Sequence, residues 1–374
     1  MPRRVPGLAG FIVLALALPA LSHASDAEFS SYAIVGMDYR DEFYDRAGEN
    51  SETAPMLRRI KADFRYDPSG PWQVRVGGNY GAVYFDDETD DRAGFNDAYV
   101  RYQWPGRVRL QLGRMREPFG FERLTGFSRI AGTERSLVSN ALAPGRSLGL
   151  KYSNYSRHDT RAIGVFREDE NPGSPLALTA RYTYAPIVDD NTLHFGISGS
   201  WRYLRGEEFQ IRDRAEVFRG ATISRSAIYL ADEAQQLGLD MLWQSSGSLT
   251  LVGELMGQRV VRDDGLEWYY SGFYVQGSYL VTGEQRNYRR GSLREVRPAS
   301  SRGAWELVGR FSHLNLRDHS VGSRTGVGVA GVNYYLNRDV NFKLHYLRSE
   351  ITGNTLHDET LGNALIFRTQ FTIL

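Results

Sequence analysis

Apolar and polar residues alternate along almost the whole 374-residue chain, and this restricts the possible folds more than any other feature. In the segment 107–112, apolar side chains at positions 108, 110 and 112 alternate with Arg107, Arg109 and Gln111. Successive side chains of a β-strand point to opposite faces, so a period of two predicts strands with one apolar and one polar face. A helical membrane protein is excluded, because each of its spans needs about 20 apolar residues.

Sixteen alternating segments can be counted between residues 31 and 373. They lie at 31–40, 56–66, 71–85, 95–104, 107–115, 147–153, 159–168, 176–185, 191–204, 235–245, 248–261, 267–281, 303–317, 325–336, 340–351 and 361–373. A further candidate near 209–219 carries too many charges to be counted. Bacterial outer-membrane barrels have an even number of antiparallel strands. The fold class predicted is therefore all-β, as a sixteen-stranded antiparallel transmembrane β-barrel.

The connections between these segments alternate in length. Short turns rich in Pro, Gly, Asn and Asp occur at 67–70, 105–106, 154–158, 186–190, 246–247 and 337–339. Longer loops lie between them, at 41–55, 86–94, 116–146, 169–175, 205–234, 318–324 and 352–360. Outer-membrane barrels keep their short turns on the periplasmic side. The connection 282–302 is the exception, because it is long and yet falls on the short-turn side.

The first 24 residues predict a secretory signal peptide. Arg3 and Arg4 precede an apolar run at 8–21, and Ser22 and Ala24 supply small residues before a cleavage site. The mature chain, 25–374, would then form the barrel domain in the outer membrane of a Gram-negative bacterium, in contact with its lipid. The absence of Cys excludes disulfides and thiolate chemistry.

The charges are nearly balanced overall, with 45 basic and 44 acidic residues, so no bulk charge favours a nucleic-acid partner. A closed sheet of this many strands encloses water, and its polar face should line the interior. The cations on that face are Arg59, Lys61, Arg65, Arg75, Arg101, Arg107, Arg109, Lys151, Arg181, Arg310, Lys343 and Arg368. The acids are Asp63, Asp97, Asp240, Glu254 and Glu306. This excess predicts a basic channel that prefers anions, although a shift of one residue in a strand would exchange its faces.

The long loop 116–146 carries arginines and several large apolar residues. The apolar residues predict that it packs against the inner wall and narrows the pore. We expect Arg123, Arg129 and Arg135 to contact anions through their planar donor groups. Arg116 and Arg146 lie at the strand ends and are expected to anchor the loop. The alternative is that the loop's arginines form ion pairs with glutamates along the wall, and both interpretations can hold for different arginines.

Several stretches resemble the phosphate-selective porin O and P family of Gram-negative outer membranes. They are Leu57–Ile60, Gly113–Gly120, Glu134–Leu137, Asn140–Arg146, Gly272–Glu284, Gly303–Ser312 and Val332–Asn337. The resemblance implies a sixteen-stranded barrel, usually trimeric, with an inward-folded third loop and arginines that guide anions. It also suggests that the 282–302 connection is a family feature. The phosphate-specific members use lysines as well as arginines along the permeation path, whereas this chain has three lysines in all. It also ends on Leu374, whereas barrels of this kind usually end on an aromatic residue.

An enzyme is the main rival class. Residues 145–149 match G-x-S-x-G, but a nucleophile elbow needs a strand before the serine and a helix after it, and an alternating strand follows here. The acidic run 86–91 lacks the spacing of a calcium loop. We therefore expect no catalysis, metal or cofactor, and passive diffusion of small anions, with phosphate or polyphosphate as candidates. The alternatives are a general diffusion porin without phosphate specificity and a structural or adhesive barrel.

Overall fold

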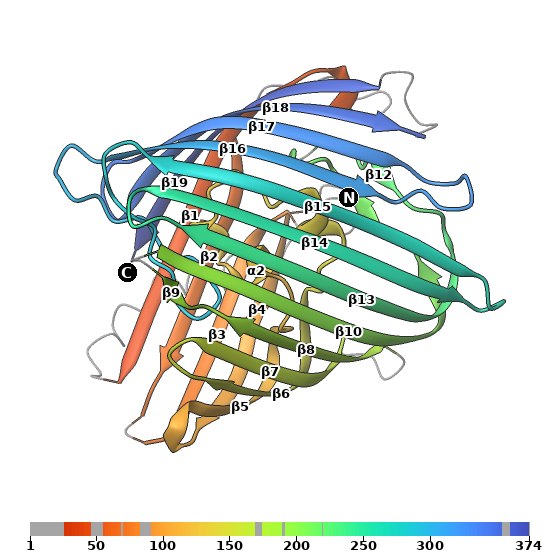
Figure 1. The fold of residues 1–374 in the computed structure, drawn as a ribbon, viewed down its shortest axis with the longest axis horizontal. Coiled ribbons are helices and arrows are strands. Elements are labelled where there is room, and N and C mark those ends of the chain that lie inside the picture. Colours follow the sequence, from red (N-terminus) through yellow and green to blue (C-terminus); the bar gives the residue numbers. More distant parts are fainter. Residues whose placement is uncertain are drawn as a thin grey trace, which may run out of the picture.

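The structure, a computed structural model, describes residues 26–45, 55–68, 70–82, 91–168, 174–188, 191–218, 220–353 and 360–373. Sixteen long strands form one antiparallel sheet that closes on itself (Figure 1). Closure comes from β1 (Ala27–Arg40), which pairs with β2 (Met56–Tyr66) on one side and β19 (Leu361–Ile373) on the other. The predicted signal peptide, 1–24, lies outside the described residues, as do residues 86–90 of the acidic run.

The remaining long strands follow in chain order around the barrel, each paired with its neighbours. They are β3 (Trp72–Ala82), β4 (Asp91–Gln103), β5 (Val108–Arg116), β6 (Arg146–Tyr155), β7 (Asp159–Arg167), β8 (Leu176–Tyr184), β10 (Asn191–Phe209), β13 (Tyr229–Gln244), β14 (Leu249–Arg262), β15 (Glu267–Leu280), β16 (Ala304–Asn315), β17 (Arg324–Tyr335) and β18 (Val340–Thr352). Short strands are β9 (Ile187–Val188), beside β10, and the pair β11 (Arg212–Asp213) and β12 (Ser224–Arg225). The predicted number of long strands is confirmed. Several of them extend past their predicted ends, most of all β10 and β13.

The outer face of the sheet is apolar. Leu112, Val165 and Val275 are each more than half exposed there, although they lie within strands. A band of exposed apolar residues on a closed sheet is the surface that faces lipid. Trp305 is exposed on this face near a strand end, as a membrane-interface residue should be, whereas Trp268 points inward and is 4% exposed. No helix among the described residues is long and apolar enough to cross a membrane.

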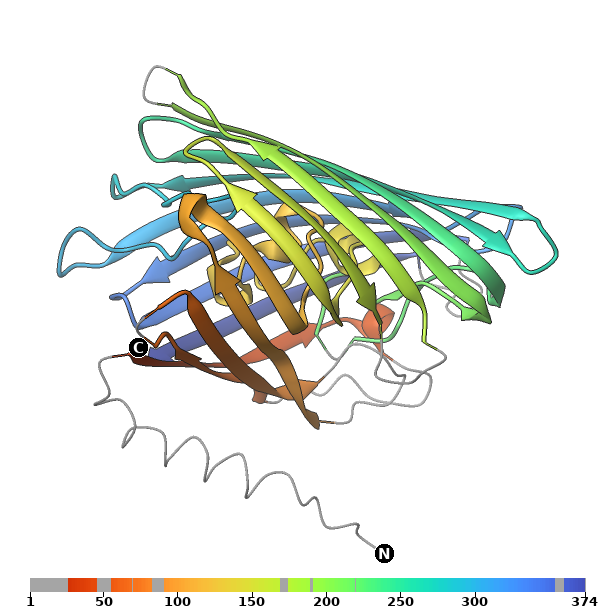
Figure 2. The same cartoon turned by 90° about the horizontal axis from the view of Figure 1, so that it is seen from below.

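The connection between β5 and β6 lies on the inner side of the sheet (Figure 2). It contains the short helices α2 (Phe121–Leu124) and α3 (Leu137–Ala141) and the 3-10 turn η4 (Phe127–Arg129). α3 begins after Ser136, whose Oγ accepts the Ser139 N–H at 3.3 Å, which is a common helix cap. Buried apolar residues of this loop pack with inward side chains of β13–β17, so the core lies inside the barrel. The principal members are Phe119, Leu137, Val138, Met256, Tyr274 and Leu314.

Candidate functional site

The three glutamates of the loop form ion pairs with arginines of the barrel wall. Glu134 binds Arg58 through two hydrogen bonds of 2.6 Å, and Glu117 accepts a hydrogen bond of 2.6 Å from Arg202. Glu122 lies 3.3 Å from Arg310. All three carboxylates are buried. The two-point pair of Glu134 fixes both distance and orientation, and the three ion pairs together hold the loop in place against the wall.

Wall side chains also bind the backbone of the loop. Glu254 on β14 accepts the N–H groups of residues 121 and 122, each at 2.7 Å. Lys343 on β18 donates to the carbonyls of residues 130 and 132 at 2.8 and 2.9 Å, and Arg310 donates to the carbonyl of residue 134 at 3.1 Å. The sequence predicted that Lys343 and Arg310 line the interior. The structure instead buries both beneath the loop, because its carbonyls need donors there.

Three arginines of the loop region have a different kind of partner. Arg116 donates to the carbonyls of residues 123, 124 and 125 at 2.9, 2.8 and 3.2 Å. Arg123 donates to the Pro144 carbonyl at 3.1 Å, and Arg135 donates to the Thr125 carbonyl at 3.1 Å. Within the part of the chain that the structure describes, none of the three forms an ion pair with a carboxylate. Their positive charge is therefore held in place without being neutralised.

A fourth arginine joins them from the wall. The guanidinium carbon of Arg59 lies 4.4 Å from the centre of the Phe127 ring, and that of Arg135 lies 5.3 Å from the same ring. Arg59 also donates a hydrogen bond to Tyr32 on β1. We call Arg59, Arg116, Arg123 and Arg135 the arginine cluster. All four are half-buried, so water inside the barrel reaches them.

The cluster concentrates positive charge. Burial and the guanidinium of Arg116 lower the pKa of Arg123 from its usual value, and burial and Arg123 lower the pKa of Arg135. Each shift has the direction that neighbouring cations impose on one another. A concave surface lined by one sign of charge raises the local concentration of counter-ions. The arrangement therefore favours the entry of small anions.

The sequence placed Arg59 on the inner face but missed its neighbour Arg58. The pairing of β1 with β2 shifts by one residue between Ile34 and Val35, which leaves an extra residue in β2. Such a β-bulge interrupts the alternation of faces, and Arg58 and Arg59 both turn inward as a result. The adjacent arginines were the available signal, because two successive charged residues break a period of two.

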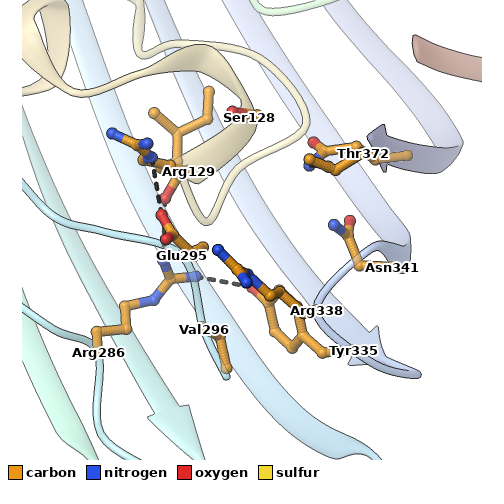
Figure 3. Close-up of a pocket in the computed structure, with 11 residues that line it drawn as sticks. Ser128, Arg129, Arg286, Glu295, Val296, Tyr335, Arg338, Asn341 and Thr372 are labelled. Carbon is orange, nitrogen blue, oxygen red and sulfur yellow. Dashed lines mark hydrogen bonds and ion pairs between the residues drawn. The ribbon is translucent and has the colours of Figure 1, made fainter. Parts of the chain in front are cut away.

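Two loop residues predicted to act alongside the cluster have carboxylate partners. Arg146 lies 3.0 Å from Asp97 on β4, as expected of a wall anchor. Arg129 lies 3.0 Å from Glu295 of the 282–302 connection, at the edge of a cavity of about 70 Å³ (Figure 3). For Arg129 the structure therefore agrees with the alternative interpretation, an ion pair with a glutamate, which the opposite connection supplies.

Other residues predicted to line the interior also fall into two groups, those paired with carboxylates and those bound to neutral partners. Lys61 and Arg75 both pair with Asp63 in the β2–β3 region. Arg101 and Arg109 bind neutral partners: Arg101 donates to Tyr99 and Arg109 to Tyr155, each at 2.9 Å. Only part of the predicted basic lining is therefore uncompensated.

Comparisons with known proteins agree with this geometry. The family model described as phosphate-selective porin O and P matches residues 30–373. Porin O of Pseudomonas aeruginosa is 22% identical over 379 residues, covering 88% of this chain and 84% of Porin O. Among solved structures, OmpT of Vibrio cholerae superposes with a TM-score of 0.58 at 8% identity, covering 93% of this chain and 97% of OmpT. The anion-selective porin from Comamonas acidovorans gives a TM-score of 0.56 at 11% identity, covering 93% of this chain and 99% of that porin. The two structures share the fold, and the family match covers residues 30–373 of the 374, so we conclude that this protein is an outer-membrane porin of the phosphate-selective porin O and P family.

Proposed function

We propose that this porin conducts small anions by passive diffusion and that the arginine cluster sets its ion preference. The observation that carries the proposal is the set of partners of these side chains. Carbonyls, a hydroxyl and an aromatic ring hold them, and carbonyl oxygens do not cancel a full positive charge. The loop 116–146 then acts as the constriction, with Arg116, Arg123 and Arg135 facing the water path.

Phosphate or polyphosphate is the proposed preferred substrate. Guanidinium groups present parallel N–H donors that match two oxygens of a phosphate group, and such charge-assisted bonds are stronger than neutral ones. The family description and the similarity to Porin O support the same choice. A general anion porin remains the second candidate, because chloride would be attracted by the same positive charge.

Planar-bilayer recording tests both the anion conduction and the preference for phosphate. Under a potassium chloride gradient, the sign of the reversal potential should show that chloride permeates better than potassium. Inorganic phosphate added to chloride solution should then reduce the chloride current at low concentrations. A cation-selective reversal potential would refute anion conduction, and anion selectivity without phosphate block would favour the general porin.

Assembly and processing are proposed from the sequence and its relatives. We infer a homotrimer after removal of residues 1–24, with the barrel domain formed by 25–374. Amino-terminal sequencing of protein from isolated outer membranes should begin at Ser25. Native mass measurement in detergent should give three copies, and a monomer under conditions that keep other porin trimers intact would contradict the trimer.

A further inference from the structure

The long connection on the short-turn side forms a hairpin. Tyr288 and Leu293 pair as an antiparallel bridge, and Arg289 N–H donates to the Ser292 carbonyl at 2.9 Å. The two residues at the tip have positive φ angles, 50° for Arg290 and 73° for Gly291. This is the geometry of a two-residue turn in which Asn and Gly are favoured at both positions. A Cβ atom at positive φ is unfavourable, so the conformation of the turn alone does not explain an arginine at the first position.

The hairpin reaches from β15 along the short-turn rim to the far side of the mouth. Gln285 Nε2 donates to the carbonyl of Ser245, which follows β13, at 2.6 Å. Tyr288 Oη lies 2.6 Å from Nδ1 of His194 on β10. The tip meets the end of β6, where the guanidinium of Arg290 lies 3.7 Å from the centre of the Tyr155 ring. Contacts with β10 and β6 thus fix the tip beneath the opening.

A second arginine lies over the same ring. The guanidinium of Arg109, on β5, is 4.5 Å from the Tyr155 ring centre, and its Nη2 donates to Tyr155 Oη at 2.9 Å. Among the residues described, neither Arg109 nor Arg290 forms an ion pair with a carboxylate. Arg294, on the return strand of the hairpin, has a buried Nε without a hydrogen-bond partner in the described structure. The tip therefore brings two unneutralised cations to one tyrosine ring.

This group is separate from the arginine cluster. Arg146, beside the cluster, and Tyr155 lie at opposite ends of β6, nine residues apart. At about 3.3 Å per residue, this spacing is roughly 30 Å. An anion that leaves the cluster would meet the hairpin tip only at the other end of the barrel.

We propose that the hairpin tip forms a second anion site at the short-turn mouth, with Arg109 and Arg290 as its ligands. Tyr155 is the positioning residue, because both guanidinium groups lie over its ring and Arg109 also donates to its hydroxyl. Like charges held together without an acid favour a small oxyanion such as inorganic phosphate between them. The inference rests on the proposed anion conduction and adds a site that acts after the constriction.

The proposed site can be tested by comparing how strongly phosphate blocks the chloride current when it is added to one side of the membrane or to the other. Channels inserted in one orientation would receive inorganic phosphate from the short-turn side or from the long-loop side. The variant Arg290→Asn removes the charge but keeps a residue that this turn favours, so the hairpin should still form. We expect it to raise the half-blocking phosphate concentration from the short-turn side by about fivefold, as one lost charge contact implies. Block from the long-loop side should change less, and the reversal potential should keep its sign.

Matched variants distinguish loss of the proposed site from the general effect of removing a charge or changing the fold. Arg302→Gln removes an exposed charge from the same connection, away from the tip, and should leave the sided block unchanged. Tyr155→Phe retains the ring and should have a smaller effect than Tyr155→Leu, which should reproduce the effect of Arg290→Asn. If Tyr155 had a purely structural role, these substitutions would change the unfolding midpoint but not the difference in phosphate block between the two sides.

The outcomes distinguish this inference from the proposed function. If the wild-type channel is anion-selective but Arg290→Asn and Arg109→Gln both leave short-turn-side block unchanged, the second site is refuted and anion conduction stands. Failure of phosphate to block the wild type from the short-turn side also refutes the site. A cation-selective wild-type channel would refute both.

Discussion

The two sides of the barrel interior differ in what their arginines bind. Towards β13–β18, arginines such as Arg310 are buried and bound to carboxylates, and they hold the loop to the wall. Towards β1–β6, Arg58 and Arg146 also pair with acids, but the arginines of the cluster are half-buried and bound to carbonyls, a hydroxyl and a ring. An arginine therefore serves as an anchor where an acid faces it and as a source of positive potential where none does.

Arg58 and Arg59 offer the sharpest contrast, because they are adjacent residues on one bulge. Arg58→Met removes the arginine that binds buried Glu134 through two hydrogen bonds and should destabilise the protein strongly, since breaking a buried ion pair costs about 3–5 kcal/mol. The midpoint of thermal unfolding in detergent should fall, and the open-channel current should become noisier as the loop loosens. Unchanged stability and noise would show that Glu134 does not need Arg58.

Arg59→Met is the matched substitution on the other side of the comparison. It leaves no carboxylate without a partner among the described residues, so the unfolding midpoint should stay close to that of the wild type. One unit charge at 4 Å contributes about 1 kcal/mol in water, equivalent to about fivefold in a binding constant. The chloride-to-potassium permeability ratio should fall by about that factor. A stability loss equal to that of Arg58→Met would remove the distinction between the two residues.

Arg129→Gln should have the smallest effect. Its partner Glu295 is partly exposed, and exposed ion pairs contribute about 0–1 kcal/mol. The reversal potential should shift less than for Arg59→Met, because Glu295 already offsets the charge of Arg129. A larger shift than that of Arg59→Met, measured under the same salt gradient, would place Arg129 in the ion path despite its pairing.

The strands could be predicted because their signal is local. Alternation at period two identified all sixteen, and the bounds of 56–66 and 361–373 coincide with β2 and β19. β10 and β13 extend past their predicted ends because polar residues beyond the apolar band continue the sheet pairing, as between Glu208 and Leu230. Backbone hydrogen bonds do not require an apolar face, so hydropathy alone could not locate those ends.

The site was less predictable because it depends on contacts between distant residues. The loop arginines were visible in the sequence, but Glu134 and its partner Arg58 are 76 residues apart. Nothing local showed that the acids of the loop would meet arginines of the wall and leave Arg116, Arg123 and Arg135 without acids. Arg129 was assigned to the anion path for the same reason, since Glu295 lies far along the chain.

The reversal potential of the double variant Arg123→Gln/Arg135→Gln tests the central claim most directly. Both residues bind carbonyls, and glutamine retains an amide donor for them, so the folded barrel and its conductance should persist. Under a potassium chloride gradient, we predict that the reversal potential moves from the anion-selective value of the wild type towards zero. A folded, conducting double variant with an unchanged reversal potential would contradict the account, because the preference would then come from other charges.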